Sequence, residues 1–218
     1  VFLMTLPSAC GLIVLGEPIV RLIYERGKFD ATATSMTAIA LAGYSIGLTG
    51  YAAIKILSPA FYALDDAKTP MIIAVASIAV NFLGSYFLRE WLSGFGVTPA
   101  TPHGYGHVGV ALATSIVALV NFFALALIMR KRVHRLNGRA IFASFIKIAA
   151  ASAVLSAVCY VSYRMLASVY GTASISLQLI EAFVPIALGG AAFVLTAKLL
   201  RVAELEQLFG MMRRKLAR

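Results

Sequence analysis

The sequence predicts an all-α membrane protein, a polytopic bundle of six transmembrane helices followed by an amphipathic tail. Of the 218 residues, 61% are hydrophobic and 13% are charged, whereas about a quarter of the residues of a soluble domain are charged. The mean hydropathy is +0.88. Each of six apolar segments reaches the roughly 20 residues that a helix needs to cross a bilayer. The expected spans are 1–24, 36–64, 69–89, 108–130, 141–167 and 178–200.

The net charge of +10 predicts the orientation of these spans. Basic residues crowd the loop 130–139 and the C-terminal segment 201–218. Cytoplasmic flanks of membrane helices collect Lys and Arg in this way, so we expect the cytoplasmic side here and no nucleic-acid site. The uncharged loop 168–178 is then expected outside. Because successive loops lie on alternate sides of the membrane, the loop 64–70 and both ends of the chain are expected in the cytoplasm.

The loop between the first two spans fits this orientation less well. It would carry Arg21, Arg26 and Lys28 on the outside, partly offset by Glu25 and Asp30. The charge rule tolerates such cases, because it concerns the overall bias between the two sides. The chain also begins with Val, with no charge before its first span, and we expect it to be a fragment.

The sequence predicts no enzyme. No nucleophile stands beside a base, and no glycine loop is suited to phosphate. The three histidines fall in expected loops, and Cys10 and Cys159 lie singly inside apolar spans. A lone Cys in such a span is more often a small hydrophobe than a ligand. We therefore expect no metal and no cofactor, apart from a sodium ion or proton.

The second span holds the clearest candidate site, a lysine inside an apolar run. Lys55 shares a helix face with Tyr44, Gly47, Tyr51, Ser58 and Tyr62. A charge within the membrane normally faces a cavity or a partner. We therefore predict that this face lines a substrate pathway. The alternative is that Lys55 extends its stem to the cytoplasmic interface.

Polar residues in the third and fourth spans form a second candidate site. Asn81 and Ser85 share a face of the third span, and Thr114 and Asn121 share a face of the fourth. Amides and hydroxyls in lipid seek partners, so hydrogen bonding between the two helices is one interpretation. A small-ion or proton site formed by Asn81 and Thr114 is the other.

Two spans contain an internal proline. Pro59 lies in the second span, and Pro185 lies in the sixth. Proline removes a helical hydrogen bond and bends the axis. We therefore predict helix bends at both positions.

Three stretches of the sequence resemble the MurJ/MviN family. "PSACGLIVLGEPIVRLIYERGKFD" resembles a Pro-containing helix of that family and its external "RGxFD" turn. "ALAGYSIGLTGYAAIKILSPAFYALDDAKTP" resembles the next helix, with its lysine, its "FYA" and its "D-x-K-T-P" exit. "GHVGVALATSIVALVNFFAL" is similar to the later "G-x-A-L-A-T-S" helix. The matching stretches lie within residues 7–125.

This resemblance implies a lipid II flippase of the MOP transporter superfamily, which serves peptidoglycan synthesis in the bacterial cytoplasmic membrane. Family members have two six-helix lobes and a final helix pair, and they are thought to transport by alternating access. Residues 1–130 would then be the last four helices of the second lobe, 131–201 the final pair, and 202–218 a basic cytoplasmic tail. The implied partners are the undecaprenyl-pyrophosphate-linked precursor, membrane lipid and the first lobe.

The resemblance also bears on the polar residues of the third span. Some family members use a sodium site with an acidic residue one turn after the asparagine of this span. Ser85 stands at that position here. Two rival functions remain open: a flippase of the same superfamily for O-antigen or other lipid-linked sugar, and a membrane scaffold that transports nothing.

Overall fold

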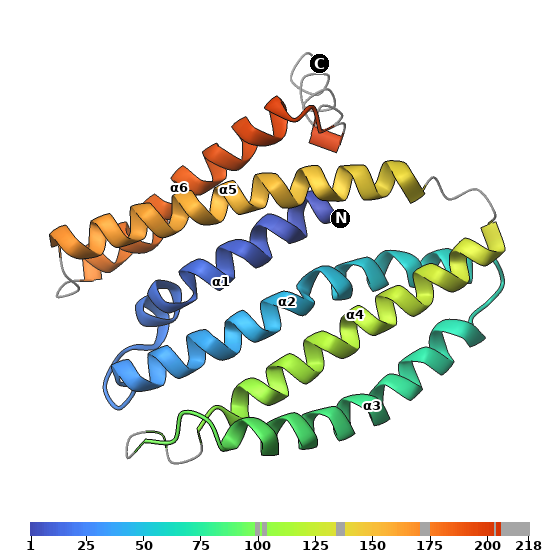
Figure 1. Cartoon of the computed structure of the whole chain (residues 1–218), viewed down its shortest axis with the longest axis horizontal. Helices are drawn as coiled ribbons and strands as arrows, with labels where there is room; N and C mark the ends of the chain where they lie inside the picture. Colours follow the sequence, from blue (N-terminus) through green and yellow to red (C-terminus); the bar gives the residue numbers. More distant parts are fainter. Residues whose placement is uncertain (99–100, 102–103, 134–137, 171–174, 203, 206–218) are drawn as a thin grey trace. The chain divides into compact units, whose positions relative to one another are not determined.

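The protein is described by a computed structural model that covers residues 1–98, 101, 104–133, 138–170, 175–202 and 204–205. These residues contain helices and no strand; Thr98 and Thr101 form an isolated bridge. All six helices are long and apolar enough to cross a membrane, which confirms the predicted all-α bundle (Figure 1). The helices are α1 Phe2–Tyr24, α2 Ala31–Tyr62, α3 Lys68–Ser93, α4 Gly106–Val133, α5 Gly138–Tyr170 and α6 Ile175–Leu199.

Local capping explains why α2 begins before the expected residue 36. The Asp30 carboxylate accepts a hydrogen bond from the Ala33 backbone N–H at 2.8 Å, which satisfies one of the free donors of the first turn. The Thr34 hydroxyl donates to the Glu25 carboxylate at 2.7 Å. Polar residues thus extend α2 by more than a turn beyond its apolar segment.

Contacts between residues divide the chain into two units. The first unit comprises residues 23–136 and holds α2, α3 and α4. The second comprises residues 2–22 and 137–218 and holds most of α1 with α5 and α6. Contacts thus group α1 with the last two helices, whereas the sequence-based division placed it with the next three. The functional division into lobe, final pair and tail stays a prediction.

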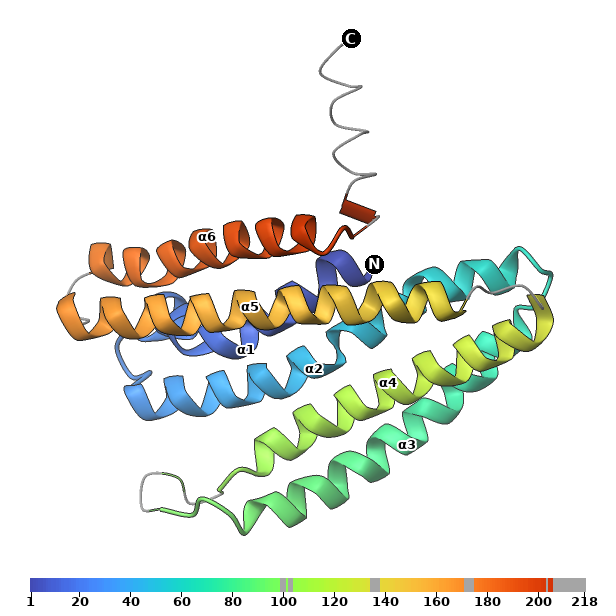
Figure 2. The same ribbon diagram turned by 45° about the horizontal axis from the view of Figure 1, so that its top comes forward.

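In the first unit, α2 and α4 run in the same direction and touch along a seam of small residues (Figures 1 and 2). A Cβ atom on Gly47 would lie 2.6 Å from the Ser115 Cα atom. A Cβ atom on Gly50 would lie 2.9 Å from the Ala118 carbonyl oxygen. Such close backbone approach is how helices associate in lipid, where hydrophobic driving force is absent. We call this the glycine seam; its members are Gly43, Gly47 and Gly50 of α2 with Ala111, Ser115 and Ala118 of α4.

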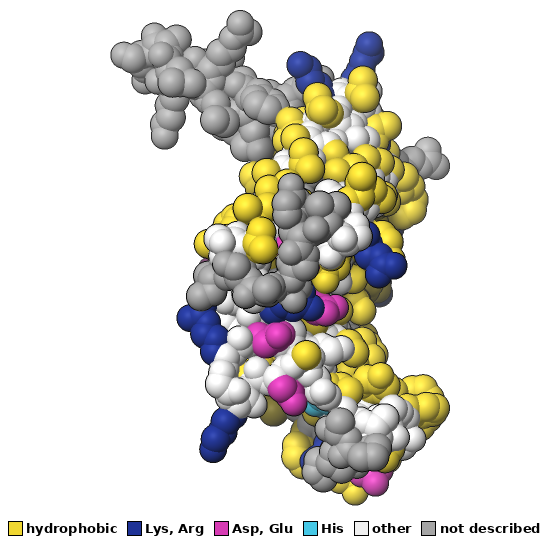
Figure 3. Space-filling view, turned by 90° about the vertical axis from the view of Figure 1, so that its left-hand side faces the viewer, with side chains coloured by type: hydrophobic (Ala, Val, Ile, Leu, Met, Phe, Trp, Pro, Cys, Tyr) yellow, Lys and Arg dark blue, Asp and Glu magenta, His cyan; other side chains and the backbone are white. Residues whose placement is uncertain are grey.

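Helix α3 packs antiparallel against α4 and leaves most of its surface open. Gly109 of α4 approaches the Leu88 backbone, and Gly84 of α3 faces the Ala113 side chain. Among its residues, only Pro70 is buried. Figure 3 shows hydrophobic side chains over much of one surface of the molecule, as a protein in lipid requires. The exposed hydrophobic residues of α3 include Met71, Ile72, Val75, Ile78, Phe82, Leu83, Tyr86 and Phe87.

Asp66 joins three elements at the turn between α2 and α3. Its carboxylate accepts hydrogen bonds from the Thr69 hydroxyl at 2.6 Å and the Thr69 backbone N–H at 3.0 Å. It also forms an ion pair with Arg132 of α4 at 2.7 Å. The Asp66 side chain is 11% exposed. The Thr69 bonds, together with the Arg132 guanidinium, hold the pKa of Asp66 below its ordinary value of 3.8.

We expect Asp66→Asn to lower the unfolding temperature of the purified protein at pH 7. Because the pKa is depressed in the folded state, the stabilisation is present above 3.8 and is lost as the pH falls through the folded value. The difference from the unmodified protein should therefore shrink below pH 3.8. Asp65→Asn is the control, because Asp65 is exposed and its left-handed backbone, with φ of 56°, suits asparagine. An equal effect of both substitutions at pH 7 would contradict this role of Asp66.

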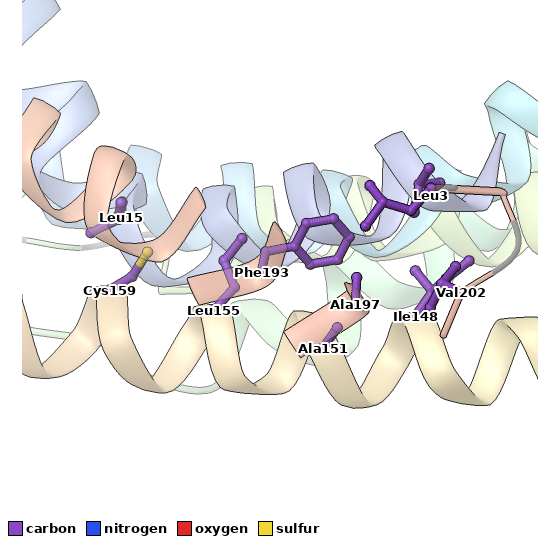
Figure 4. Close-up of a cluster of buried hydrophobic side chains, with 10 residues drawn as sticks. Leu3, Leu15, Ile148, Ala151, Leu155, Cys159, Phe193, Ala197 and Val202 are labelled. Carbon is purple, nitrogen blue, oxygen red and sulfur yellow. The ribbon is translucent and has the colours of Figure 1, made fainter. Parts of the chain in front are cut away.

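The core of the second unit lies along α1, α5 and α6 (Figure 4). Leu15 and Cys159 lie at one end of this core, and Ile148 and Val202 lie at the other. The Cys159 thiol donates to the Pro185 carbonyl oxygen at 3.3 Å. Both cysteines are free thiols, as expected for small residues inside spans. The core residues are Leu3, Leu15, Ile148, Ala151, Leu155, Cys159, Phe193, Ala197, Val202 and Leu205.

The predicted tail 202–218 lies mostly outside the described residues. Val202 and Leu205 belong to the buried core of the second unit. The amphipathic character of the remainder stays a prediction.

Candidate substrate-facing surface

The predicted pathway residues of α2 form an exposed stripe beside the glycine seam. Tyr44, Tyr51 and Tyr62 are 45%, 43% and 56% exposed. Lys55 is exposed as well, and Ser58 is half-buried. The stripe lies about 100° around the helix from the glycines that pack on α4. The packing of the first unit thus leaves this face open, which is the condition that a substrate pathway needs; the role itself stays a prediction.

A proline concentrates polar groups at the centre of this stripe. Pro59 has no N–H, so the Lys55 carbonyl lacks the donor that a helix normally provides four residues later. Helix α2 nevertheless continues to Tyr62. Lys55 lies two turns before that end, roughly 10 Å along the axis, and a lysine stem covers part of this distance. An ammonium group and a carbonyl oxygen therefore occupy the same stretch of an otherwise apolar helix. The predicted bends at Pro59 and Pro185 stay predictions.

The second candidate site shows bonds within each helix rather than between helices. The Ser85 hydroxyl donates to the Asn81 side-chain oxygen at 3.0 Å. The Thr114 hydroxyl donates to the Val110 carbonyl at 2.9 Å. Asn81, Ser85, Thr114 and Asn121 are all half-buried. Among the described contacts, no hydrogen bond joins Asn81 to Thr114, and ion binding at this site stays a prediction.

Ser115 makes the polar bond between helices that sequence reasoning missed. Its hydroxyl donates to the Gly43 carbonyl oxygen at 2.6 Å. Successive small residues of α4 are four and then three positions apart, at Ala111, Ser115 and Ala118. The glycines of α2 have the same spacing, at Gly43, Gly47 and Gly50. That repeat was the signal available in the sequence.

His107 lies in the first turn of α4, so the prediction that all three histidines occupy loops is wrong for it. The helix begins at Gly106, earlier than the apolar pattern indicated. The His107 Nε2 atom is 3.0 Å from the Met36 carbonyl oxygen of α2. This contact ties the two helices together near the start of α4. Within the described part of the chain, no three potential metal ligands gather.

Arg21 lies in the last turn of α1, inside the predicted span 1–24. Its side chain is 14% exposed and pairs with Glu17 at 2.7 Å and with Glu181 of α6 at 3.6 Å. Two carboxylates thus permit the helix to carry a guanidinium up to its end at Tyr24. The spacing of four residues between Glu17 and Arg21 typifies a helical ion pair and was readable in the sequence.

Six long apolar helices, with small-residue packing in the first unit and an ion pair between α1 and α6 in the second, define a multi-pass α-helical membrane protein. The family model described as "Lipid II flippase MurJ" matches residues 1–181, and the chain belongs to this family. The match extends well beyond the stretch 7–125 that carried the resemblance, through α5 and into α6.

The chain is also similar in sequence to individual members of the family. The chain is 38% identical over 131 residues to the lipid II flippase MurJ of Burkholderia cenocepacia, covering 60% of this chain and 23% of that protein. It is 42% identical over 97 residues to a probable lipid II flippase MurJ of Rhizobium meliloti, covering 44% and 18%. It is 35% identical over 116 residues to the lipid II flippase MurJ of Thermosipho africanus, covering 53% of this chain and 22% of that protein. The matched part thus spans about a quarter or less of each relative's length.

Proposed function

We propose that the chain forms part of a flippase that moves lipid II across the bacterial cytoplasmic membrane. The open lysine and tyrosine stripe of α2 is the observation that supports this function, together with the family. Lipid II is a peptidoglycan precursor linked to undecaprenyl pyrophosphate. The Lys55 ammonium would attract the anionic headgroup as a point charge. The tyrosines would offer amphipathic walls for the sugar.

The proposed mechanism is reorientation of the bound headgroup, with no covalent step. Alternating access requires helices that change their exposure as units. The glycine seam couples α2 to α4 over about two turns, and Asp66 links the start of α3 to the end of α4. The stripe would therefore move with a rigid group of helices. Coupling to sodium or protons through Asn81 and Ser85 remains part of the proposal.

The proposed location is the cytoplasmic membrane, with both ends of the chain in the cytoplasm. The charge bias of the loop 130–139 supports this orientation. It places the turn at Asp66 on the inner side and the start of α4 on the outer side.

A complementation experiment tests the function. The gene, at its natural length, is expressed in cells whose own lipid II flippase can be depleted. We expect growth to be restored and newly made lipid II to become accessible at the outer face of the membrane. Growth arrest with accumulation of inward-facing lipid II, despite normal protein levels, would contradict the proposal. Restored export of O-antigen precursor without restored growth would favour the rival flippase.

A further inference from the structure

Glu181 of α6 is a buried carboxylate without hydrogen-bond donors. The residue is 4% exposed, and neither Oε1 nor Oε2 has a hydrogen-bond partner. The Arg21 Nη1 atom lies 3.6 Å from Oε2, within ion-pair range but beyond a good hydrogen bond. An ionised carboxylate in such surroundings costs several kcal/mol, unless it is fully paired. Glu181 therefore needs more compensation than Arg21 provides.

Arg21 is shared between two carboxylates. Its Nη2 atom is 2.7 Å from Glu17 Oε1, a tighter contact than the one with Glu181. Tyr163 of α5 lies close enough to the same guanidinium to interact with it electrostatically. The titratable groups facing Glu181 are thus Glu17 and Arg21 from α1 and Tyr163 from α5. With both carboxylates ionised, this polar cluster would carry one net negative charge inside the helices.

The four members of the polar cluster come from corresponding ends of their helices. Arg21 lies in the last turn of α1, Tyr163 lies two turns before the end of α5, and Glu181 lies in the second turn of α6. Glu17 is 47% exposed, whereas Glu181 is 5% exposed at its side chain. A half-exposed acid thus lies beside a buried one near the helix ends, which is the arrangement expected of an exchangeable proton.

We propose that the polar cluster is a binding site for a single proton, carried by the Glu181 carboxyl group. The proton forms an O–H bond on one Glu181 oxygen and removes the uncompensated charge, while Arg21 stays paired with Glu17. A metal cation would stand beside the Arg21 guanidinium and be repelled by it. The proton therefore fits the site better than sodium.

Release of the proton changes the contacts between helices. The ionised Glu181 carboxylate competes with Glu17 for the Arg21 guanidinium. The half-exposed Glu17 can give up this ion pair, because the end of α1 can supply it with water instead. The proton leaves at the ends of the helices beside the cluster, which are the end of α1, the end of α5 and the start of α6. Protonation thus weakens the attachment of α1 to α6, and deprotonation strengthens it. This inference concerns the second unit and does not rest on the transport proposed above.

Infrared spectroscopy of the natural-length protein in lipid nanodiscs tests this site. We expect a protonated carboxyl band at neutral pH that disappears in Glu181→Gln. Glu17→Gln should also remove it at neutral pH, because Arg21 then pairs with Glu181 alone and favours the carboxylate. Glu90→Gln is the control, since Glu90 is exposed on α3 and should leave the band unchanged.

Other outcomes overturn the proposal. They are the absence of the band in the unmodified protein, its persistence in Glu181→Gln, or its loss when sodium replaces potassium at constant pH. A second variant covers a failure of Glu181→Gln to fold: Glu181→Asp should keep a carboxyl band at a shifted frequency, and an unshifted band would contradict the assignment. Because glutamine mimics a neutral carboxyl, we also expect Glu181→Gln to change the unfolding temperature little.

Discussion

Replacing Gly47 with leucine will prevent α2 from packing on α4 and will abolish any transport that depends on the first unit. Even the Cβ atom of alanine would lie 2.6 Å from the Ser115 Cα atom and 2.7 Å from its hydroxyl oxygen. Backbone atoms cannot give way as a flexible side chain can, so Gly47→Ala should cost about 1–3 kcal/mol and Gly47→Leu more. The measurement is the unfolding temperature of the purified protein, with the yield of folded protein.

Gly190→Ala provides the matched control for this prediction. Gly190 is also a helical glycine, but a Cβ atom there would meet nothing within 4 Å. This substitution should leave the unfolding temperature unchanged or raise it slightly, because alanine favours the helix. Equal unfolding temperatures for Gly47→Ala and Gly190→Ala would contradict the glycine seam.

Lys55→Met will strongly reduce transport while leaving the protein folded. Lys55 is exposed and lies outside the glycine seam, so its removal takes away a charge and no packing. Lys55→Arg should retain part of the activity, because it keeps the charge but not the compact geometry of the ammonium group. The measurement is lipid II accessibility at the outer face, in cells that depend on the variant.

Lys68→Met is the control for charge alone. Lys68 is exposed at the start of α3, outside the stripe, and its replacement should leave transport near normal. Normal transport by Lys55→Met would remove Lys55 from the substrate pathway. A lysine that only reaches the membrane interface would give that result.

Length and hydropathy were sufficient to predict the six helices, because a bilayer demands about 20 apolar residues per crossing whatever the packing. The helix ends were harder to predict. Asp30 extends α2 through a side-chain cap, and His107 enters α4 because that helix begins at Gly106. Such polar additions lie outside the apolar pattern and depend on local hydrogen bonds.

The helix partners could not be read from hydropathy. The bond from Ser115 to Gly43 and the ion pair between Arg21 and Glu181 each join residues far apart in the sequence. Periodicity places a residue on a face but does not say which helix that face meets. The same limit explains why Asn81 and Thr114, each on a polar face, make their bonds within their own helices.

The stripe of α2 is the part of the candidate site that periodicity predicted well. Tyr44, Tyr51, Lys55 and Tyr62 share one face by their spacing, and the structure leaves all four exposed. Exposure alone does not distinguish water from lipid, because the apolar residues of α3 are exposed too. Contact of the stripe with water or with lipid therefore decides whether it can line a substrate pathway.

The most direct test of the proposed pathway compares two single cysteines in a protein that lacks Cys10 and Cys159. One replaces Lys55, and the other replaces Phe82, which is 73% exposed on the apolar face of α3. Both side chains are open to their surroundings, but maleimide reacts rapidly only with a hydrated thiolate. A water-soluble maleimide should label Lys55→Cys rapidly in intact membranes and Phe82→Cys far more slowly. Equally slow labelling of both positions would mean that the stripe faces lipid, and the proposed pathway would be wrong.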